Sequence, residues 1–211
     1  MQIIPAFVTQ NKCYQAGAPL TPRGIMLHSV GTPQPSAAVF ARSFNQYQPG
    51  GVSVCVHAFA QADGTVYQTL PWEMRGWHCG GSANSTHIGV EMTEPSAGMT
   101  RSEAAEQIAG TYRTVVELFA ELCKQYELDP AQDGVLIGHA EGHRRGAASN
   151  HADPELLWRT YDMGYTMDGF RRDVAEAMKN GAREEALDMP RYDSVAEMPQ
   201  WARAGVQRLI D

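Results

Sequence analysis

The stretch RGIMLHSVG, residues 23–31, predicts the central element of the fold. Its apolar run is short and stops at Gly-Thr-Pro, a pattern typical of a buried strand. His28 stands at the end of this strand, where a polar side chain reaches the edge of a sheet. The first candidate functional residue therefore accompanies the first predicted strand.

Further strands are predicted toward the carboxyl terminus. SVCVHAFAQADGTVYQTL (53–70) indicates two strands joined by a turn at an Asp-Gly pair, which is a strong hairpin signal. THIGVEM (86–92) has the pattern of another strand, and GVLIGH (134–139) that of a further one. The last of these delivers His139 at its end, as the first strand delivers His28.

Two helices are predicted between and after these strands. The clearer one begins at a capping box made by Thr100 and Glu103. Its apolar residues share one helical face: Ile108, Tyr112, Val115, Phe119, Leu122 and Tyr126. In the second helix Phe170, Val174 and Met178 are spaced four apart, and Gly181 is expected to end it.

Alternating strands and helices predict an α/β fold, with a mixed central β-sheet flanked by helices. Polar side chains at the carboxyl ends of its strands are the expected place for a site. Residues 1–181 are expected to form one domain. Residues 182–211 are expected to form a charged linker and a short C-terminal helix, PQWARAGVQRLID, with Pro199 near its first turn. One short helix buries no core of its own, so it docks on this domain, docks on another chain or begins a further module.

The composition excludes several classes of protein. The formal net charge of −7 argues against a partner such as nucleic acid. The first residues, MQIIPAFVTQNK, lack the basic and apolar regions of a signal peptide, so none is expected. No apolar run is long enough for membrane insertion across a bilayer. The cysteines form no CxxC pair and are expected to be buried, small hydrophobic residues: Cys13, Cys55, Cys79 and Cys123.

The loop GHAEGHRRGAASNHADPELLW (138–158) permits three kinds of metal chemistry. His139 and His143 are four apart, as in the HExxH signature of zinc proteases, but Glu141 stands one position too late. His139-Ala-Glu141 also matches half of a zinc deaminase signature, whose Pro-Cys-x-x-Cys half does not occur in the chain. Neither pattern is complete.

The third interpretation pairs His139, at its strand end, with Asp153, after a long turn. A catalytic zinc site takes three protein ligands and a water molecule, and His28 is the natural third ligand. For each histidine taken singly, a hydrogen-bonded residue without metal is the alternative. Three candidates at the ends of elements favour zinc.

Four segments in this order resemble one family. They are GIMLHSVGT, the hairpin with ADGTVYQ, GWHCGGS followed by THIGVEM, and GH…HADPELLW, and they lie between Gly24 and Trp158. The chain resembles the zinc-dependent N-acetylmuramoyl-L-alanine amidases of the amidase-2 type, which are related to phage lysozyme-amidases and animal peptidoglycan-recognition proteins. The resemblance implies that His28, His139 and Asp153 bind zinc. It also implies the fold of these proteins, to which the segment PQWARAGVQRLID adds a short C-terminal helical tail.

The resemblance implies roles for further residues. Glu91 matches a carboxylate that handles the proton of the attacking water. His151 stands where many relatives have a lysine that stabilises the oxyanion, and the charge of an imidazole depends on pH in a way that lysine's does not. Trp77 and His78 are candidates for lining the substrate groove, although Trp77 also suits a core.

The loop between His139 and Asp153 looks longer than in compact relatives, which leaves His143 as an alternative ligand to His139. His57 and His87 are expected to be structural.

The function implied is hydrolysis of the amide between the lactyl group of N-acetylmuramic acid and L-alanine in peptidoglycan. The alternatives are a non-catalytic peptidoglycan-binding module and a cytosolic enzyme that recycles muropeptides. The terminal segment YDSVAEMPQWARAGVQRLID faintly resembles the opening of repeat modules that follow amidase domains, which favours a phage or prophage endolysin. Such a protein is made in the cytoplasm and acts on the cell wall after release. The sequence predicts no oligomeric state.

Overall fold

The computed structural model describes residues 1–46 and 54–188, with side chains up to Gly181. Its contacts divide the chain into two compact units, Met1–Met178 and Lys179–Asp211. The predicted helix PQWARAGVQRLID lies outside the described residues. No helix within the described part of the chain has the length and apolar character needed to cross a membrane.

Within the described residues, the first unit contains one mixed sheet of six strands in the order β1-β4-β3-β5-β2-β6. β2 lies between β5 and β6 and is parallel to both, and β3 is parallel to β5. β3 and β4 form the predicted antiparallel hairpin, with Gly64 at positive φ in its turn, and β1 is parallel to β4. The strands are β1 (Gln2–Pro5), β2 (Gly24–Ser29), β3 (Ala58–Ala60), β4 (Thr65–Gln68), β5 (His87–Met92) and β6 (Leu136–Gly138). The prediction of a mixed sheet flanked by helices is confirmed.

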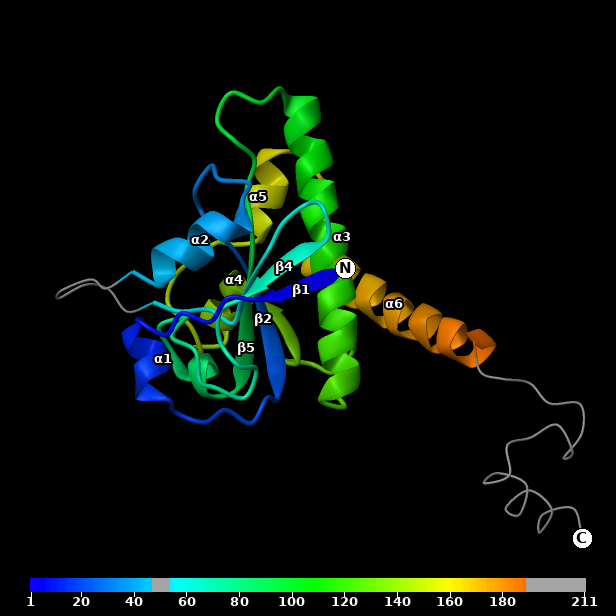
Figure 1. Cartoon of the computed structure of the whole chain (residues 1–211). Coiled ribbons are helices and arrows are strands. Elements are labelled where there is room, and N and C mark those ends of the chain that lie inside the picture. Colours follow the sequence, from blue (N-terminus) through cyan, green and yellow to red (C-terminus); the bar gives the residue numbers. More distant parts are fainter. Residues whose placement is uncertain (47–53, 189–211) are drawn as a thin grey trace, which may run out of the picture. The chain divides into compact units, whose positions relative to one another are not determined.

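Helices surround this sheet, and the long helix α3 runs beside it (Figure 1). The helices are α1 (Lys12–Ala16), α2 (Ala37–Phe44), a 3₁₀ turn (Ser82–Ser85), α3 (Arg101–Gln125), α4 (His139–Arg144), α5 (Glu155–Thr160) and α6 (Met167–Asp188). The capping box of α3 is present: Thr100 Oγ1 accepts from the Glu103 N–H, and the Glu103 carboxylate accepts from the Thr100 N–H at 2.8 Å.

The two faces of the sheet bury different clusters, because neighbouring residues of a strand point to opposite faces. Ile25 and Leu27 of β2 pack in the main core with residues of α3 such as Val115. Met26, between them, packs on the other face against Cys79 and against Ala83 of the 82–85 turn. His28 has the same parity as Met26 and so faces away from α3. The candidate site therefore lies on the face opposite the main core.

α6 differs from its prediction. Phe170 and Val174 are fully buried, as their spacing predicts, but the helix continues through Gly181 to Asp188. The prediction that Gly181 ends the helix is wrong. A glycine inside a helix costs only about 1 kcal/mol relative to alanine, and a helix ends at glycine where the backbone turns left-handed. Gly181 is not among the residues with positive φ.

The cysteine prediction is confirmed. All four thiols are free and buried, with exposed fractions of 0 to 1%. They take the place of small apolar side chains, and none is a ligand of the polar cluster described next.

Candidate metal centre

Two histidines meet at the carboxyl edge of the sheet. His28 is the last residue but one of β2, and His139 is the first residue of α4, directly after β6. Since β2 and β6 are parallel neighbours, both side chains arrive at the same edge. Their Nδ1 atoms lie 3.0 Å apart, although the residues are separated by 111 positions. Both side chains are nearly inaccessible to solvent.

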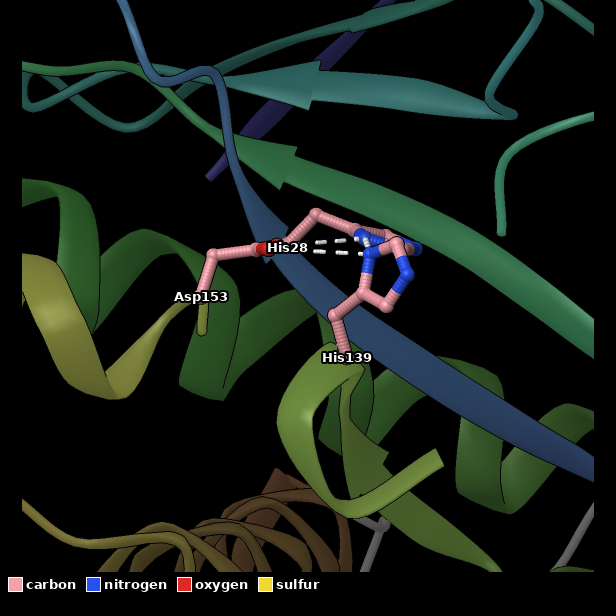
Figure 2. A group of neighbouring side chains, drawn as sticks. All are labelled: His28, His139 and Asp153. Carbon is pink, nitrogen blue, oxygen red and sulfur yellow. Dashed lines mark hydrogen bonds and ion pairs between the residues drawn. The ribbon is translucent and has the colours of Figure 1, made fainter. Parts of the chain in front are cut away.

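Asp153 completes the cluster from the loop before α5, and the three side chains point toward one another (Figure 2). Its Oδ2 lies 3.3 Å from His28 Nδ1, and its Oδ1 lies 3.6 Å from His139 Nδ1. The carboxylate also accepts a hydrogen bond from the Ser29 backbone N–H at 3.3 Å. The Asp153 carbonyl accepts from the Ala140 N–H, which ties this loop to the start of α4.

The three side chains fit a zinc ion. One ligand atom from each lies within 4.8 Å of the others, in the only such arrangement found among the described residues. Zinc with ligands at roughly 2.0–2.1 Å in a tetrahedron separates neighbouring ligand atoms by about 3.3 Å. The distances of 3.0, 3.3 and 3.6 Å are close to that spacing. Two imidazoles and one carboxylate are also a donor set typical of catalytic zinc, which leaves a fourth position for water.

The electrostatics of the cluster favour a cation. Burial opposes a charge on His28, but its hydrogen bond to Asp153, with the charges of Glu91 and Asp153, raises its pKa above the ordinary value. Burial and the nearby His28 lower the pKa of His139 to about 4. Burial opposes ionisation of Asp153, but the hydrogen bond and charge of His28 lower its pKa. The cluster thus stabilises one positive charge where its ligand atoms converge.

Each histidine of the cluster also has a partner on its outer nitrogen. His28 Nε2 lies 2.9 Å from His78 Nδ1, and His139 Nε2 lies 3.2 Å from Ser149 Oγ. Neither ring therefore has a nitrogen left over for other partners. A metal-binding histidine commonly has such a second hydrogen bond, which fixes the orientation of its ring.

Glu91 lies beside the cluster, on β5. In the register of β2 and β5 it is paired with His28. Its Oε2 is buried without a hydrogen-bond partner. Burial raises the pKa of its carboxyl to about 7, opposed by the charge of His28. A carboxyl group with a pKa near neutrality is suited to accept and return a proton.

A pocket of about 410 Å³ opens over these residues. It is lined by both histidines of the cluster and by Glu91, and its other walls include Trp77, His78 and His151. The His151 ring is exposed and stacks on the ring of His139, with centroids 4.6 Å apart. Of the candidate residues predicted from the sequence, all but Asp153 and the alternative ligand His143 line this pocket. Asp153 lies behind it, against the two histidines.

His143 does not join the cluster. It is exposed, and its Nδ1 lies 3.4 Å from the Ala148 carbonyl oxygen. His139, the first residue of α4, is buried in the cluster. The side chain of His143, four residues later in the same helix, is exposed to solvent. His57 and His87 are structural: His57 Nδ1 accepts from the Gly89 N–H at 2.9 Å, and His87 Nε2 lies 2.9 Å from the Gly134 carbonyl oxygen.

Sequence reasoning missed Ser149 and Asn84. Ser149 contacts His139, and the Asn84 side-chain oxygen accepts hydrogen bonds from the backbone N–H groups of His78 and Cys79. The only signal for them was their place in the glycine-rich segments that flank the motifs. Those segments showed no periodicity from which side-chain direction could be inferred.

The chain matches the family model described as N-acetylmuramoyl-L-alanine amidase, amidase-2, over residues 18–156. No curated protein matches it in sequence. Similar solved structures include the Staphylococcus aureus hydrolase AmiA in complex with its ligand, at 19% identity and a TM-score of 0.66, covering 87% of this chain and 86% of that chain. The catalytic domain of XlyA is 22% identical with a TM-score of 0.59, covering 82% and 99%. A mutant endolysin from Bacillus subtilis is 20% identical with a TM-score of 0.59, also covering 82% and 99%. At these identities the likenesses show a shared fold.

Proposed function

Because this chain belongs to the amidase-2 family of N-acetylmuramoyl-L-alanine amidases and acts on peptidoglycan, we propose that the pocket over His28, His139 and Asp153 is its active site. The observation that carries this proposal is the convergence of these three ligands next to the buried, unpartnered Glu91 oxygen. Zinc held there would polarise the scissile carbonyl and lower the pKa of a water molecule to about 7.

Glu91 acts as the general base and then as the general acid. It takes a proton from the water that attacks the lactyl carbonyl carbon. The carbon–nitrogen bond breaks, and Glu91 returns the proton to the departing amine of L-alanine. The products are a free lactyl carboxyl group and a free stem peptide. The raised pKa of Glu91 supports this role, because such a carboxyl group exchanges a proton readily near neutral pH.

His151 stabilises the developing charge on the carbonyl oxygen by donating a hydrogen bond. Its ring lies at the pocket, stacked on a ligand, where a donor for that oxygen is needed. Trp77 and His78 form a wall of the groove against which the substrate packs. Since both nitrogens of His78 have partners, His78 contributes ring surface to the substrate and no hydrogen bond. The substrate in this groove combines a glycan strand with the first residues of a stem peptide.

We further propose that the chain acts on the wall as a phage or prophage endolysin, with residues 1–181 as the catalytic domain. Residues 182–211, which begin with the last turns of α6, would then be a linker and the start of a wall-binding part. The fold shared with a Bacillus subtilis endolysin supports this assignment. The net charge of −7 argues against a nucleic-acid partner, and no helix of the described residues is long and apolar enough to cross a membrane. In the test, purified protein should lower the turbidity of cells whose membranes have been permeabilised. Unchanged turbidity would remove the lytic role.

Mass spectrometry of the products from purified walls tests the reaction itself. The expected products carry free lactyl ends and free L-alanine amines, and a chelator should abolish them until zinc is restored. Binding to walls without release of these ends would instead indicate a peptidoglycan-binding module. Cleavage restricted to soluble muropeptides would favour a recycling enzyme.

A further inference from the structure

Two chains of hydrogen bonds lead away from the metal centre, and each ends on a backbone carbonyl. We infer that His78 and Ser149 are positioning residues that hold His28 and His139 in the tautomer and orientation whose Nδ1 atoms face the zinc. One chain runs from His28 through His78 to the carbonyl of His87. The other runs from His139 through Ser149 to the carbonyl of Cys79.

The first chain determines the tautomer of His28. His78 Nε2 lies 3.1 Å from the His87 carbonyl oxygen, which only accepts, so this nitrogen carries a proton. His78 also lies between the rings of His28 and His57, at centroid distances of 5.1 and 6.0 Å, where a second proton would put a charge among imidazoles. The neutral ring therefore presents Nδ1 as an acceptor. His28 Nε2, 2.9 Å away, must be the donor, and its Nδ1 is left for the metal.

The second chain determines the tautomer of His139 in the same way. The Ser149 hydroxyl donates its single hydrogen to the Cys79 carbonyl oxygen at 3.0 Å. It then has only lone pairs to offer to His139 Nε2, 3.2 Å away. His139 Nε2 is therefore protonated, and its Nδ1 is left for the metal. With both outer nitrogens protonated, the two Nδ1 lone pairs face each other and the carboxylate of Asp153, an arrangement that calls for a cation.

Both chains depend on the segment that contains His78 and Cys79. The Asn84 side-chain oxygen accepts from the N–H groups of these two residues, at 2.9 and 3.0 Å, and so fixes the backbone of the segment. Gly89 of β5 leaves room for the His78 ring, since a Cβ there would lie 2.5 Å from His78 Cγ. One short segment thus holds both histidine ligands from outside the metal centre.

This inference rests on the proposed zinc site. The zinc content of the unaltered protein tests separately whether that site exists. Zinc affinity is then measured by competition with a chromophoric chelator. His78→Phe keeps the ring but removes the acceptor, and Ser149→Ala removes only a hydroxyl. Each should weaken zinc binding about 10–100-fold, as is typical when a partner of a ligand is removed. His78→Gln should retain more affinity than His78→Phe, because an amide both accepts and donates.

His143→Ala serves as the matched control, because His143 lies four residues after His139 in α4 and takes part in neither chain of hydrogen bonds. It should bind zinc as the unaltered protein does. Circular dichroism checks that each variant folds. If His78→Phe does not fold, Ser149→Ala, which lacks only one oxygen atom, still tests whether removing a hydrogen-bond partner weakens zinc binding.

Nuclear magnetic resonance of the histidine rings in the zinc-loaded protein gives a second readout. Both His28 and His139 should show a protonated, slowly exchanging Nε2. In His78→Phe the protection should be lost at His28 and kept at His139, and Ser149→Ala should show the reverse. Unchanged zinc affinity in both variants, or a protonated Nδ1 on either zinc-bound ligand, would overturn the inference. A raised KM with unchanged zinc affinity in His78→Phe would make His78 a substrate contact alone.

Discussion

The imidazole of His151 stacks on the imidazole of His139, with the ring planes inclined by 23°. This contact places an exposed ring, two positions before the ligand Asp153, over a histidine that belongs to the metal centre. The stacked ring is part of the wall of the pocket that both histidines of the metal centre also line. The position of His151 therefore suits a hydrogen-bond donor to the substrate.

His151→Ala is expected to lower kcat by about 10²–10³-fold, the usual cost of removing one donor to a developing oxyanion. KM should change less, and zinc content should stay constant because His151 is not a ligand. His151→Lys should retain substantial activity, since an ammonium group also donates to the oxyanion. Steady-state kinetics on a soluble muropeptide measure both variants. An unchanged kcat in His151→Ala would leave His151 as a support for the Asp153 loop.

Glu91→Gln is expected to keep the zinc and the fold while losing about 10²–10⁴-fold in kcat, because an amide cannot take up the proton of the attacking water. Glu94→Gln is the matched control. Glu94 is a neighbouring acid that accepts a hydrogen bond from the Gly31 N–H at 2.8 Å, and glutamine preserves that acceptor. Kinetics and metal analysis of the pair should separate a role in proton transfer from a loss of negative charge. Full turnover in Glu91→Gln would remove Glu91 from the mechanism.

Alanine at His28, His139 or Asp153 is expected to strip the zinc and the activity together. His143→Ala should keep both, because His143 points to solvent. Zinc content is measured by mass spectrometry of the metal after dialysis. Chelation should also lower the Tm of the unaltered protein, since zinc at about 100 times its Kd stabilises the fold by about 2.7 kcal/mol. A metal-replete His139→Ala protein would contradict the ligand assignment.

His57 is expected to make the protein less stable as the pH falls. Its Nδ1 accepts from the Gly89 N–H and its Nε2 lies 2.7 Å from the Met74 carbonyl oxygen, so the folded state holds the ring neutral. Burial lowers its pKa from 6.5 to about 4. The unfolded state therefore binds more protons between these values, and stability falls as the pH drops through this window. At about 1.4 kcal/mol per pKa unit, the loss is about 3 kcal/mol.

Urea unfolding at several pH values measures this effect. In His57→Gln, which has no titrating ring, the part of the loss between pH 6.5 and 4 that belongs to His57 should disappear. The difference between the two proteins removes contributions from other groups. Identical pH profiles for the two proteins would show that His57 does not carry the effect.

The sequence by itself determined the local elements and a short set of candidate ligands. The apolar run of RGIMLHSVG, the Asp-Gly hairpin and the capping box at Thr100 depend on neighbouring residues, and each formed where its pattern predicts. The spacing of apolar residues in these segments carries information about burial, so a mixed sheet with flanking helices followed from the pattern. The candidates His28, His139 and Asp153 followed from their places at strand ends and from the resemblance to a family.

Only the tertiary structure decided how distant segments meet. The place of β1 beside β4 at the edge of the sheet depends on pairing between segments far apart in the sequence. The exclusion of His143 and the contact of Ser149 with His139 depend on how the loop after α4 packs against Cys79, 70 residues from Ser149. The course of α6 past Gly181 also went against the local signal, because the propensity of one glycine is a weak term. Hydrogen bonds such as that between His28 and His78, 50 residues apart, have no periodic trace in the sequence. The bond between His28 and His78 exists because the segment before β5 packs on the sheet, where Gly89 leaves room for the His78 ring beside His28, and no local spacing relates these residues.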